Sequence, residues 1–176
     1  IIAEISKIKD LLISKEIKPE NNIGINTNID IQNFFEKIQY SGDNSLIRSF
    51  DNDYTFGLYS LANNMFETYL IIKINNFDLA FKSTLDWERF MMVDLKQIFI
   101  GNNENLATST KKYIKNDTDI FVDRTIKNND VREYVKNEDN IDIIYGFINK
   151  DYLLITSGES SFIDIKNRVL KENISR

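Results

Sequence analysis

Residues 53–74, DYTFGLYSLANNMFETYLIIKI, decide the fold of this chain. Two runs rich in aromatic and β-branched residues flank the dipeptide Asn63-Asn64, a pattern typical of two strands joined by a turn. Phe56 and Leu58 alternate with their neighbours in the first run, so one side of that strand is expected to face a core. The stretch therefore predicts a β-hairpin.

A long amphipathic helix is predicted directly after this hairpin. In NNFDLAFKSTLDWERFMMVDLKQIF, large apolar residues recur at helical spacing. Asn76 is a suitable cap for a first helical segment, Thr84 can begin a second one, and Gly101 ends the pattern. At about 100° per residue, Trp87 and Met91 fall on one stripe, which is expected to pack on a sheet.

Four strand-like runs occupy the second half of the chain: DIFVDRTI, DVREYV, IDIIYGFI and YLLITS. Short, turn-rich links separate them, which predicts an antiparallel meander. GESSFIDIKNRVLKEN then closes the chain as a helix, with Ser160 or Ser161 as its cap. The apolar stripe of this helix contains Phe162, Ile165 and Val169.

These patterns predict an α+β fold with a mainly antiparallel sheet and helices packed on one face. The order hairpin-then-helix occurs twice, at 55–85 and at 143–170, and each helix has a phenylalanine in its first turn, Phe77 and Phe162. This repetition indicates either a duplicated strand-hairpin-helix unit or a common local way of covering a sheet.

An N-terminal helix at 1–18 is predicted ahead of a single α+β domain at 19–176. Ile5 and Ile8 belong to an apolar stripe at helical spacing, and Pro19 ends the helix because the residue before a proline resists helical geometry. Such a helix could continue from an anchor upstream, and its apolar face would be open to a partner.

Composition excludes several classes of function. The 176 residues include 22 Lys and Arg against 27 Asp and Glu, a net charge of -5, with no basic stripe of the kind that nucleic-acid binding requires. There is no Cys and no His, which excludes a thiolate nucleophile, an imidazole base and a His-ligated metal. We expect no metal site and no cofactor.

Asp86 and Glu88 stand among apolar residues of the predicted helix, which raises the question of a carboxylate pair. On a helical wheel they point about 160° apart, so they cannot hold one small substrate together. Both follow Thr84, the second predicted helix start, where negative charge complements the helix dipole. We therefore interpret them as charges of a helix start.

Asp94 lies inside the apolar stripe, seven residues after Trp87. A bare charge there would be prohibitively costly to bury, so the carboxylate needs a partner. Arg48, Arg124 and Arg132 are the candidate partners; Arg48 comes just before the predicted hairpin, and Arg132 lies in the strand-like run DVREYV. A structural ion pair is the leading interpretation; a ligand contact and an exposed helix edge remain open.

Four segments carry a family resemblance: RSFDNDYTFGLYS, NFDLAFKSTLDWERFMMVDLKQIF, FVDRTIKNNDVREYV and IIYGFINKDYLLITSGESSFIDIKNRV. Over 23–169 the chain resembles a family of membrane-anchored envelope proteins of candidate-phyla bacteria. The matching motifs, in order, are Leu-x-Trp-Glu at Trp87 and Glu88, Asp94-Leu95, Asp130-x-Arg132, and the strand pair that closes on Ile155-Thr156.

The resemblance implies a C-terminal extracytoplasmic domain and a transmembrane anchor upstream of Ile1, with a short cytoplasmic or low-complexity head before it. It implies no activity. The expected location is the extracytoplasmic side of the cell envelope, with the cytoplasm as the alternative.

The expected function is a non-enzymatic interaction or assembly domain, with a protein partner or a second copy of the chain and no nucleic acid. Membrane contact is expected only through the upstream segment. The rival interpretation is a small-ligand or glycan-binding module, or a carboxylate-dependent glycan hydrolase. In that case Trp87 and Glu88 are the candidate ligand contacts.

Overall fold

The computed structural model describes residues 23–25, 29–61, 66–96, 98–99, 120–135 and 143–174. Its strands are β1 (Ile23–Ile25), β2 (Phe50–Ser60), β3 (Phe66–Ile74), β4 (Ile120–Ile126), β5 (Asn129–Val135), β6 (Ile144–Ile148) and β7 (Tyr152–Thr156). Its helices are α2 (Ile31–Lys37), α3 (Asn44–Arg48), α4 (Phe77–Leu95) and α5 (Glu159–Ile174). The helix predicted at 1–18 and the polar stretch 102–118 lie outside the described residues.

The described strands form one seven-stranded sheet in the order β1-β2-β3-β7-β6-β5-β4. Every neighbouring pair is antiparallel. The predicted hairpin is β2–β3, and the predicted meander is β4–β5–β6–β7. The expected fold class, α+β with a mainly antiparallel sheet, is therefore confirmed. The two halves meet at the centre, where β3 pairs with β7 and Leu70 lies opposite Ile155.

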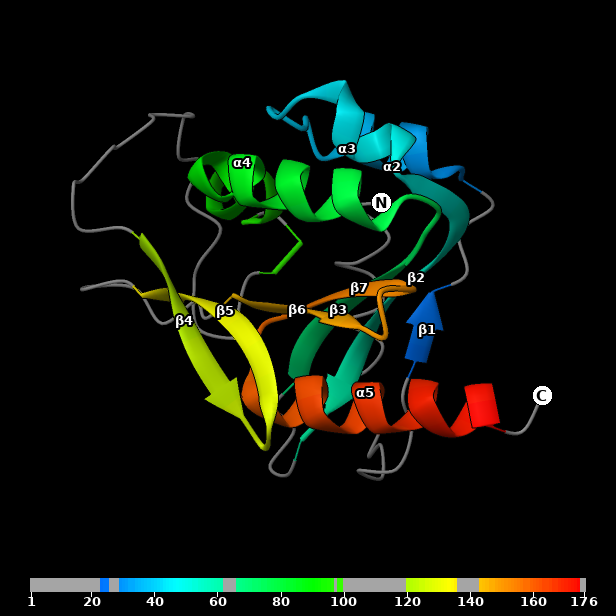
Figure 1. Cartoon of the computed structure of the whole chain (residues 1–176), viewed down its shortest axis with the longest axis vertical. Helices are drawn as coiled ribbons and strands as arrows, with labels where there is room; N and C mark the ends of the chain where they lie inside the picture. Colours follow the sequence, from blue (N-terminus) through cyan, green and yellow to red (C-terminus); the bar gives the residue numbers. More distant parts are fainter. Residues whose placement is uncertain are drawn as a thin grey trace, which may run out of the picture.

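Helices cover both faces of this sheet, which corrects the expectation that they share one face. α2, α3 and α4 lie over one side and α5 lies over the other (Figure 1). Alternate residues of β3 serve the two sides: Leu70 and Ile72 belong to the core under α4, whereas Tyr69 belongs to the core under α5. The reason is that the central strands are apolar on both faces, so each face needs a cover.

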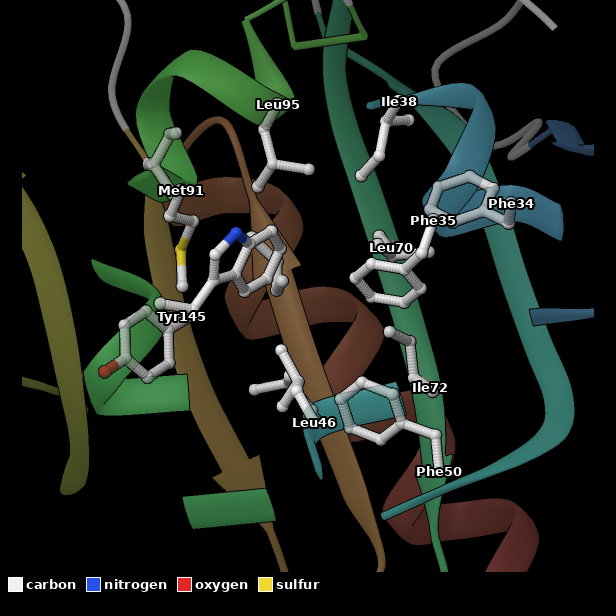
Figure 2. Close-up of a cluster of buried hydrophobic side chains, with 14 of the residues drawn as sticks. Phe34, Phe35, Ile38, Leu46, Phe50, Leu70, Ile72, Met91, Leu95 and Tyr145 are labelled. Carbon is white, nitrogen blue, oxygen red and sulfur yellow. The ribbon is translucent and has the colours of Figure 1, made fainter. Parts of the chain in front are cut away.

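The larger core combines aromatic rings from α2 with aliphatic side chains of the central strands. In Figure 2, Phe34 and Phe35 lie beside Leu70 and Ile72 of β3. Phe35 packs against Trp87 of α4 with ring centroids 5.7 Å apart. The short helices α2 and α3 thus complete a core that α4 alone does not cover.

α4 is one continuous helix and does not restart at Thr84. Asn76 caps it as predicted, because its side chain accepts a hydrogen bond from the Leu79 amide at 3.1 Å. The Thr84 hydroxyl instead donates to the carbonyl of Ala80 at 2.7 Å, inside the helix. This bond satisfies the hydroxyl, so a threonine here does not interrupt the helix.

α5 takes its N-terminal partner from a distant strand and not from the predicted serine caps. The amide of Ser161 donates to the carboxylate of Glu67, in β3, at 2.6 Å. The Ser161 hydroxyl donates to the Gly158 carbonyl at 3.1 Å. The negative charge of Glu67 also complements the helix dipole at this end. Glu67 therefore caps α5 in place of a neighbouring serine.

The turn between β4 and β5 uses left-handed backbone at two residues. Lys127 has φ 44° and Asn128 has φ 64°, and the paired residues Ile126 and Asn129 flank them. Two central residues with positive φ are the signature of a type I′ turn, whose twist matches that of the strands. The turn therefore fixes the register of the edge hairpin.

The repeated hairpin-then-helix order has no matching symmetry in space. Exchanging the antiparallel neighbours β3 and β7 requires a two-fold axis perpendicular to the sheet, and such a rotation keeps each helix on its own face. α4 and α5 lie on opposite faces (Figure 1). The repetition is therefore one of element order, and each helix covers a different core.

Gly146 of β6 provides the first test, because it lies directly beneath α5. A Cβ atom at this position would lie 2.9 Å from Cζ of Phe162. We expect Gly146→Ala to lower the free energy of unfolding by about 1–3 kcal/mol, the usual cost of overpacking a core. Urea denaturation measures the loss.

The matched control is the same change in a Phe162→Leu background, where the shorter side chain leaves room for the new methyl group. The Gly146→Ala cost should shrink by at least half in that background. Equal costs in both backgrounds would contradict a contact between Gly146 and Phe162.

Candidate functional site

Asp94 is buried, as predicted, with 1% of the residue exposed. Its carboxylate accepts three hydrogen bonds. Oδ2 accepts from the Ser41 amide at 2.9 Å and from the Trp87 indole Nε1 at 2.9 Å, and Oδ1 accepts from the Ser41 hydroxyl at 2.8 Å. All three donors are neutral groups, so the carboxylate is satisfied without a cation.

The predicted ion pair of Asp94 with Arg48 or Arg132 is therefore wrong. Arg48 lies exposed in the last turn of α3, and Arg132 binds Glu88. Within the described residues, no ion pair involves Asp94. The physical reason is that a backbone amide and two side-chain donors already fill the acceptor positions that an arginine would take.

A left-handed residue at the end of α2 brings Ser41 to Asp94. Gln39 has φ 58°, and the amide of Tyr40 donates back to the Phe35 carbonyl at 3.0 Å. This is the Schellman arrangement that commonly ends a helix and reverses the chain. The reversal aims the Ser41 amide and hydroxyl at α4.

Tyr40 also packs the same connection against α4. Its ring packs edge-on against Trp87 at 5.5 Å, and its hydroxyl donates to the Asp43 carbonyl at 2.9 Å. Burial, followed by the nearby charges of Asp43 and Asp94, raises the pKa of Tyr40. Asp94, Trp87, Ser41 and Tyr40 form one unit, which we call the Ser41 anchor.

Glu88 forms a second polar cluster on the same face of the sheet. Arg132 of β5 binds its carboxylate through two nitrogens, at 2.7 and 2.8 Å, and Tyr145 of β6 donates its hydroxyl at 2.5 Å. Arg132 also binds Asp123 of β4 at 3.0 Å. The cluster therefore ties α4 to three neighbouring strands.

The electrostatics of this cluster follow from its partial burial. The side chains of Arg132 and Glu88 are 25% and 15% exposed. Hydrogen bonding to Glu88 raises the pKa of Arg132, and burial, followed by the hydrogen bond to Glu88, raises the pKa of Tyr145. Arg132 stays cationic and Tyr145 stays neutral over the ordinary pH range, as a structural cluster requires.

Trp87 and Glu88 do not act as the ligand contacts that the rival interpretation assigned to them. Trp87 is completely buried, and its one polar atom donates to Asp94. The carboxylate of Glu88 is occupied by Arg132 and Tyr145. Both residues instead hold the sheet and its helices together.

The helix-start interpretation of Asp86 and Glu88 is also corrected. α4 begins at Phe77, so both residues lie well inside the helix. Asp78 is the acidic residue in the first turn. The error came from reading Thr84 as a second helix start.

Inside the described part of the chain, every buried side-chain nitrogen and oxygen has a hydrogen-bond partner. The same residues contain no group of three carboxylate, His or Cys side chains placed to hold a metal ion. At the two predicted carboxylate sites, Asp94 and Glu88, the internal partners occupy the oxygens that a substrate would need.

An exposed apolar strip on α4 is the surface that the sequence interpretation missed. Phe81 is 45% exposed and Leu85 is 38% exposed, and these two are the exposed large hydrophobic residues among those described. Phe77 lies one turn before Phe81, and Phe147 of β6 packs against both of these rings. We call Phe77, Phe81, Leu85 and Phe147 the α4 apolar strip.

The three phenylalanine rings of this strip pack against one another. Ring centroids are 5.9 Å apart for Phe77 and Phe81, 5.4 Å for Phe77 and Phe147, and 5.6 Å for Phe81 and Phe147. Lys150 places its ammonium 5.2 Å from the Phe77 ring. The spacing of Phe77, Phe81 and Leu85, four residues apart, was a signal that could have revealed the strip.

No protein-family model, no curated protein and no solved structure matches this chain. No described helix has both the length and the apolar character needed to cross a membrane. Functional proposals for the chain therefore start from the α4 apolar strip and the two polar clusters.

The Ser41 anchor yields a prediction that separates neutral donors from an ion pair. Asp94→Ala leaves three donors without their acceptor and should cost about 3 kcal/mol of unfolding free energy. Asp94→Asn should cost only about 1 kcal/mol, because the amide oxygen accepts from Ser41 and Trp87 while the Ser41 hydroxyl turns to accept from the new NH₂ group.

Urea denaturation of both variants measures the difference, with Ser41→Ala as a control that removes a single donor. If Asp94 neutralised a buried arginine, Asn and Ala would be almost equally damaging, since both leave that cation unpaired. Equal losses would therefore contradict the Ser41 anchor.

Tyr145 predicts how stability changes at alkaline pH. Its pKa is raised in the folded state, so the folded protein keeps a proton that the unfolded chain releases above about pH 10. The unfolded state then binds fewer protons, and stability falls as pH rises, by up to about 1.4 kcal/mol per pH unit for this one group.

The measurement is urea denaturation between pH 8 and about pH 11. Tyr145→Phe should give a shallower decline than the unsubstituted chain, whatever its stability at neutral pH. Tyr40→Phe should reduce the slope further when the two changes are combined, because the pKa of Tyr40 is raised as well. Parallel curves for all variants would refute the assignment.

Proposed function

We propose that this chain is a non-enzymatic interaction and assembly domain of a membrane-anchored bacterial envelope protein. The observation that carries the proposal is the α4 apolar strip, with Phe81 45% exposed. Exposed aromatic clusters with a polar surround are typical of protein-binding surfaces. The strip is therefore assigned as the contact surface.

The construction of the strip supports this assignment. Phe147 packs against both Phe77 and Phe81, so the rings are held in place by contacts within the fold. A surface that is rigid before binding loses little conformational entropy when a partner arrives. Aromatic residues are also the ones that most often dominate the energy of protein interfaces.

The state of the acidic residues supports a non-enzymatic role. A carboxylate-dependent glycan hydrolase needs a pair of carboxyl groups that face a substrate. Asp94 faces Ser41 and Trp87, and Glu88 faces Arg132 and Tyr145. Within the described residues, no observation favours the hydrolase or a glycan-binding platform built on Trp87.

The location is proposed from the family resemblance and from composition. The resemblance over 23–169 implies a domain outside the cytoplasmic membrane that is tethered by an upstream helix. The absence of cysteine suits an exported domain that folds without disulfide formation. A tether also fits an interaction domain, because it concentrates the contact surface near its partners.

Site-specific photo-crosslinking in the producing cells tests the proposed function. A crosslinking residue at position 85 should give one discrete protein adduct, whereas the same residue at the exposed Gln32 of α2 should not. Phe81→Glu should abolish the adduct, since loss of a central aromatic contact costs about 2 kcal/mol of binding, or about thirtyfold in affinity. Thermal denaturation checks that the variant is still folded after it loses the ring contacts of Phe81 with Phe77 and Phe147.

Gln32→Glu is the matched control, because it adds the same charge to an exposed position of another helix, α2, that is not part of the strip. It should leave the adduct unchanged. The proposed function fails if positions 85 and 32 give the same adducts, or if Phe81→Glu leaves the adduct at position 85 intact.

A further inference from the structure

We infer that the partner bound by the α4 apolar strip is a second copy of this chain, in a two-fold symmetric, antiparallel contact between two α4 helices. The inference rests on the proposed function, because it names the occupant of the same surface. Three observations support it: the charge balance of the exposed side of α4, the spacing of those charges, and the spacing of the phenylalanine rings in the strip.

The exposed side of α4 carries balanced charge although the chain as a whole does not. The net charge of the chain is -5. Asp78, Lys82, Asp86 and Arg89 are the exposed charged residues of α4, two acidic and two basic. A surface for a strongly charged partner would carry one sign, whereas a surface for a copy of itself must be self-complementary.

The spacing of the charges meets this requirement when the two-fold axis lies near the start of α4. Asp78 and Lys82 are one helical turn apart, next to the strip. A two-fold axis level with Ala80, midway between them, places Asp78 of each copy opposite Lys82 of the other. Each contact then contains two reciprocal ion pairs, as an isologous interface demands.

The same axis brings the apolar residues together. Phe77 and Phe81 are also four residues apart, so in the antiparallel arrangement the rings of one helix fit between those of the other. Phe147 supports both rings from behind in each copy. Leu85 extends the contact beyond the rings.

The small area of the contact surface predicts a weak dimer. α4 has 19 residues and is about 28 Å long at about 1.5 Å per residue, and the strip covers only its first half. Such a contact falls below the roughly 1,200 Å² of a standard stable interface. We therefore expect weak dimerisation of the free chain, with dissociation constants in the range of about 10–100 μM.

A tether to a membrane would strengthen this weak contact. Molecules held on one surface meet at a much higher effective concentration than in solution. A weak dimer in solution is therefore consistent with an assembled pair in the envelope.

Sedimentation velocity of the 176-residue chain across a concentration series provides the first test. The unsubstituted chain should dimerise, and Phe81→Glu should reduce association at least tenfold. Asp78→Lys alone should also weaken it about tenfold, because four cations then meet. The double exchange Asp78→Lys with Lys82→Asp should restore association, since it recreates both pairs at the same net charge.

Disulfide trapping provides the second test; because the chain has no cysteine of its own, any disulfide must come from the introduced residues. A mixture of Asp78→Cys and Lys82→Cys chains should form a mixed disulfide, because positions 78 and 82 of the two copies face each other with Cα atoms within about 7 Å. A Gln32→Cys chain should form a disulfide with either of them more slowly. Thermal denaturation confirms that each variant is folded, so a change in association is not a loss of structure.

The outcomes separate the inference from the proposed function. A chain that stays monomeric to millimolar concentration, yet gives a discrete adduct with a different protein through position 85, overturns the inference and leaves the proposed function standing. A dimer that is indifferent to Phe81→Glu, or a double exchange that fails to restore association, also overturns it. If the unsubstituted chain forms no dimer and the crosslinking residue at position 85 gives no adduct, the inference and the proposed function both fail.

Discussion

The hydrogen bonding of the buried Asp94 carboxylate is the constraint on which this fold most depends. It joins α4, which covers the sheet, to the connection that follows α2, and it fixes the indole of Trp87 between them. α2 and α3 lie on the same side of the sheet as α4 (Figure 1), and the connection between them reverses at Gln39 and docks on α4 through Ser41. The hydrogen bonds of one buried carboxylate thus fix the path of the chain between two helices.

Local periodicity made most of the secondary structure predictable. The hairpin β2–β3, the meander β4–β7 and the helices α4 and α5 follow from patterns that span a few residues. The burial of Asp94 was predictable too, since it interrupts an apolar stripe. Its partner was not, because the amide of Ser41 belongs to the backbone and every residue except proline offers one.

Three-dimensional context decided the features that the sequence interpretation got wrong. The consecutive apolar residues Tyr69 to Ile72 indicated a strand that is buried on both faces. Which face α5 covers was not predictable, because it depends on how the chain leaves β7. The four-residue spacing of Phe77, Phe81 and Leu85 indicated an apolar stripe, but a buried stripe has the same spacing, and it is the packing of α4 that leaves Phe81 and Leu85 exposed. Exposure of an apolar residue is a property of the assembled fold, which is why the contact surface escaped prediction.

The bond between Glu67 and Ser161 makes the start of α5 depend on the sheet. The carboxylate that accepts from the Ser161 amide lies in β3, 94 residues earlier in the chain, so the amide has this acceptor only when β3 is in place. The first free amides of the helix are thus satisfied by a tertiary contact and not by a neighbouring residue. Disturbing β3 would therefore also loosen the start of α5, and removing α5 would uncover apolar side chains such as Tyr69 and Leu154.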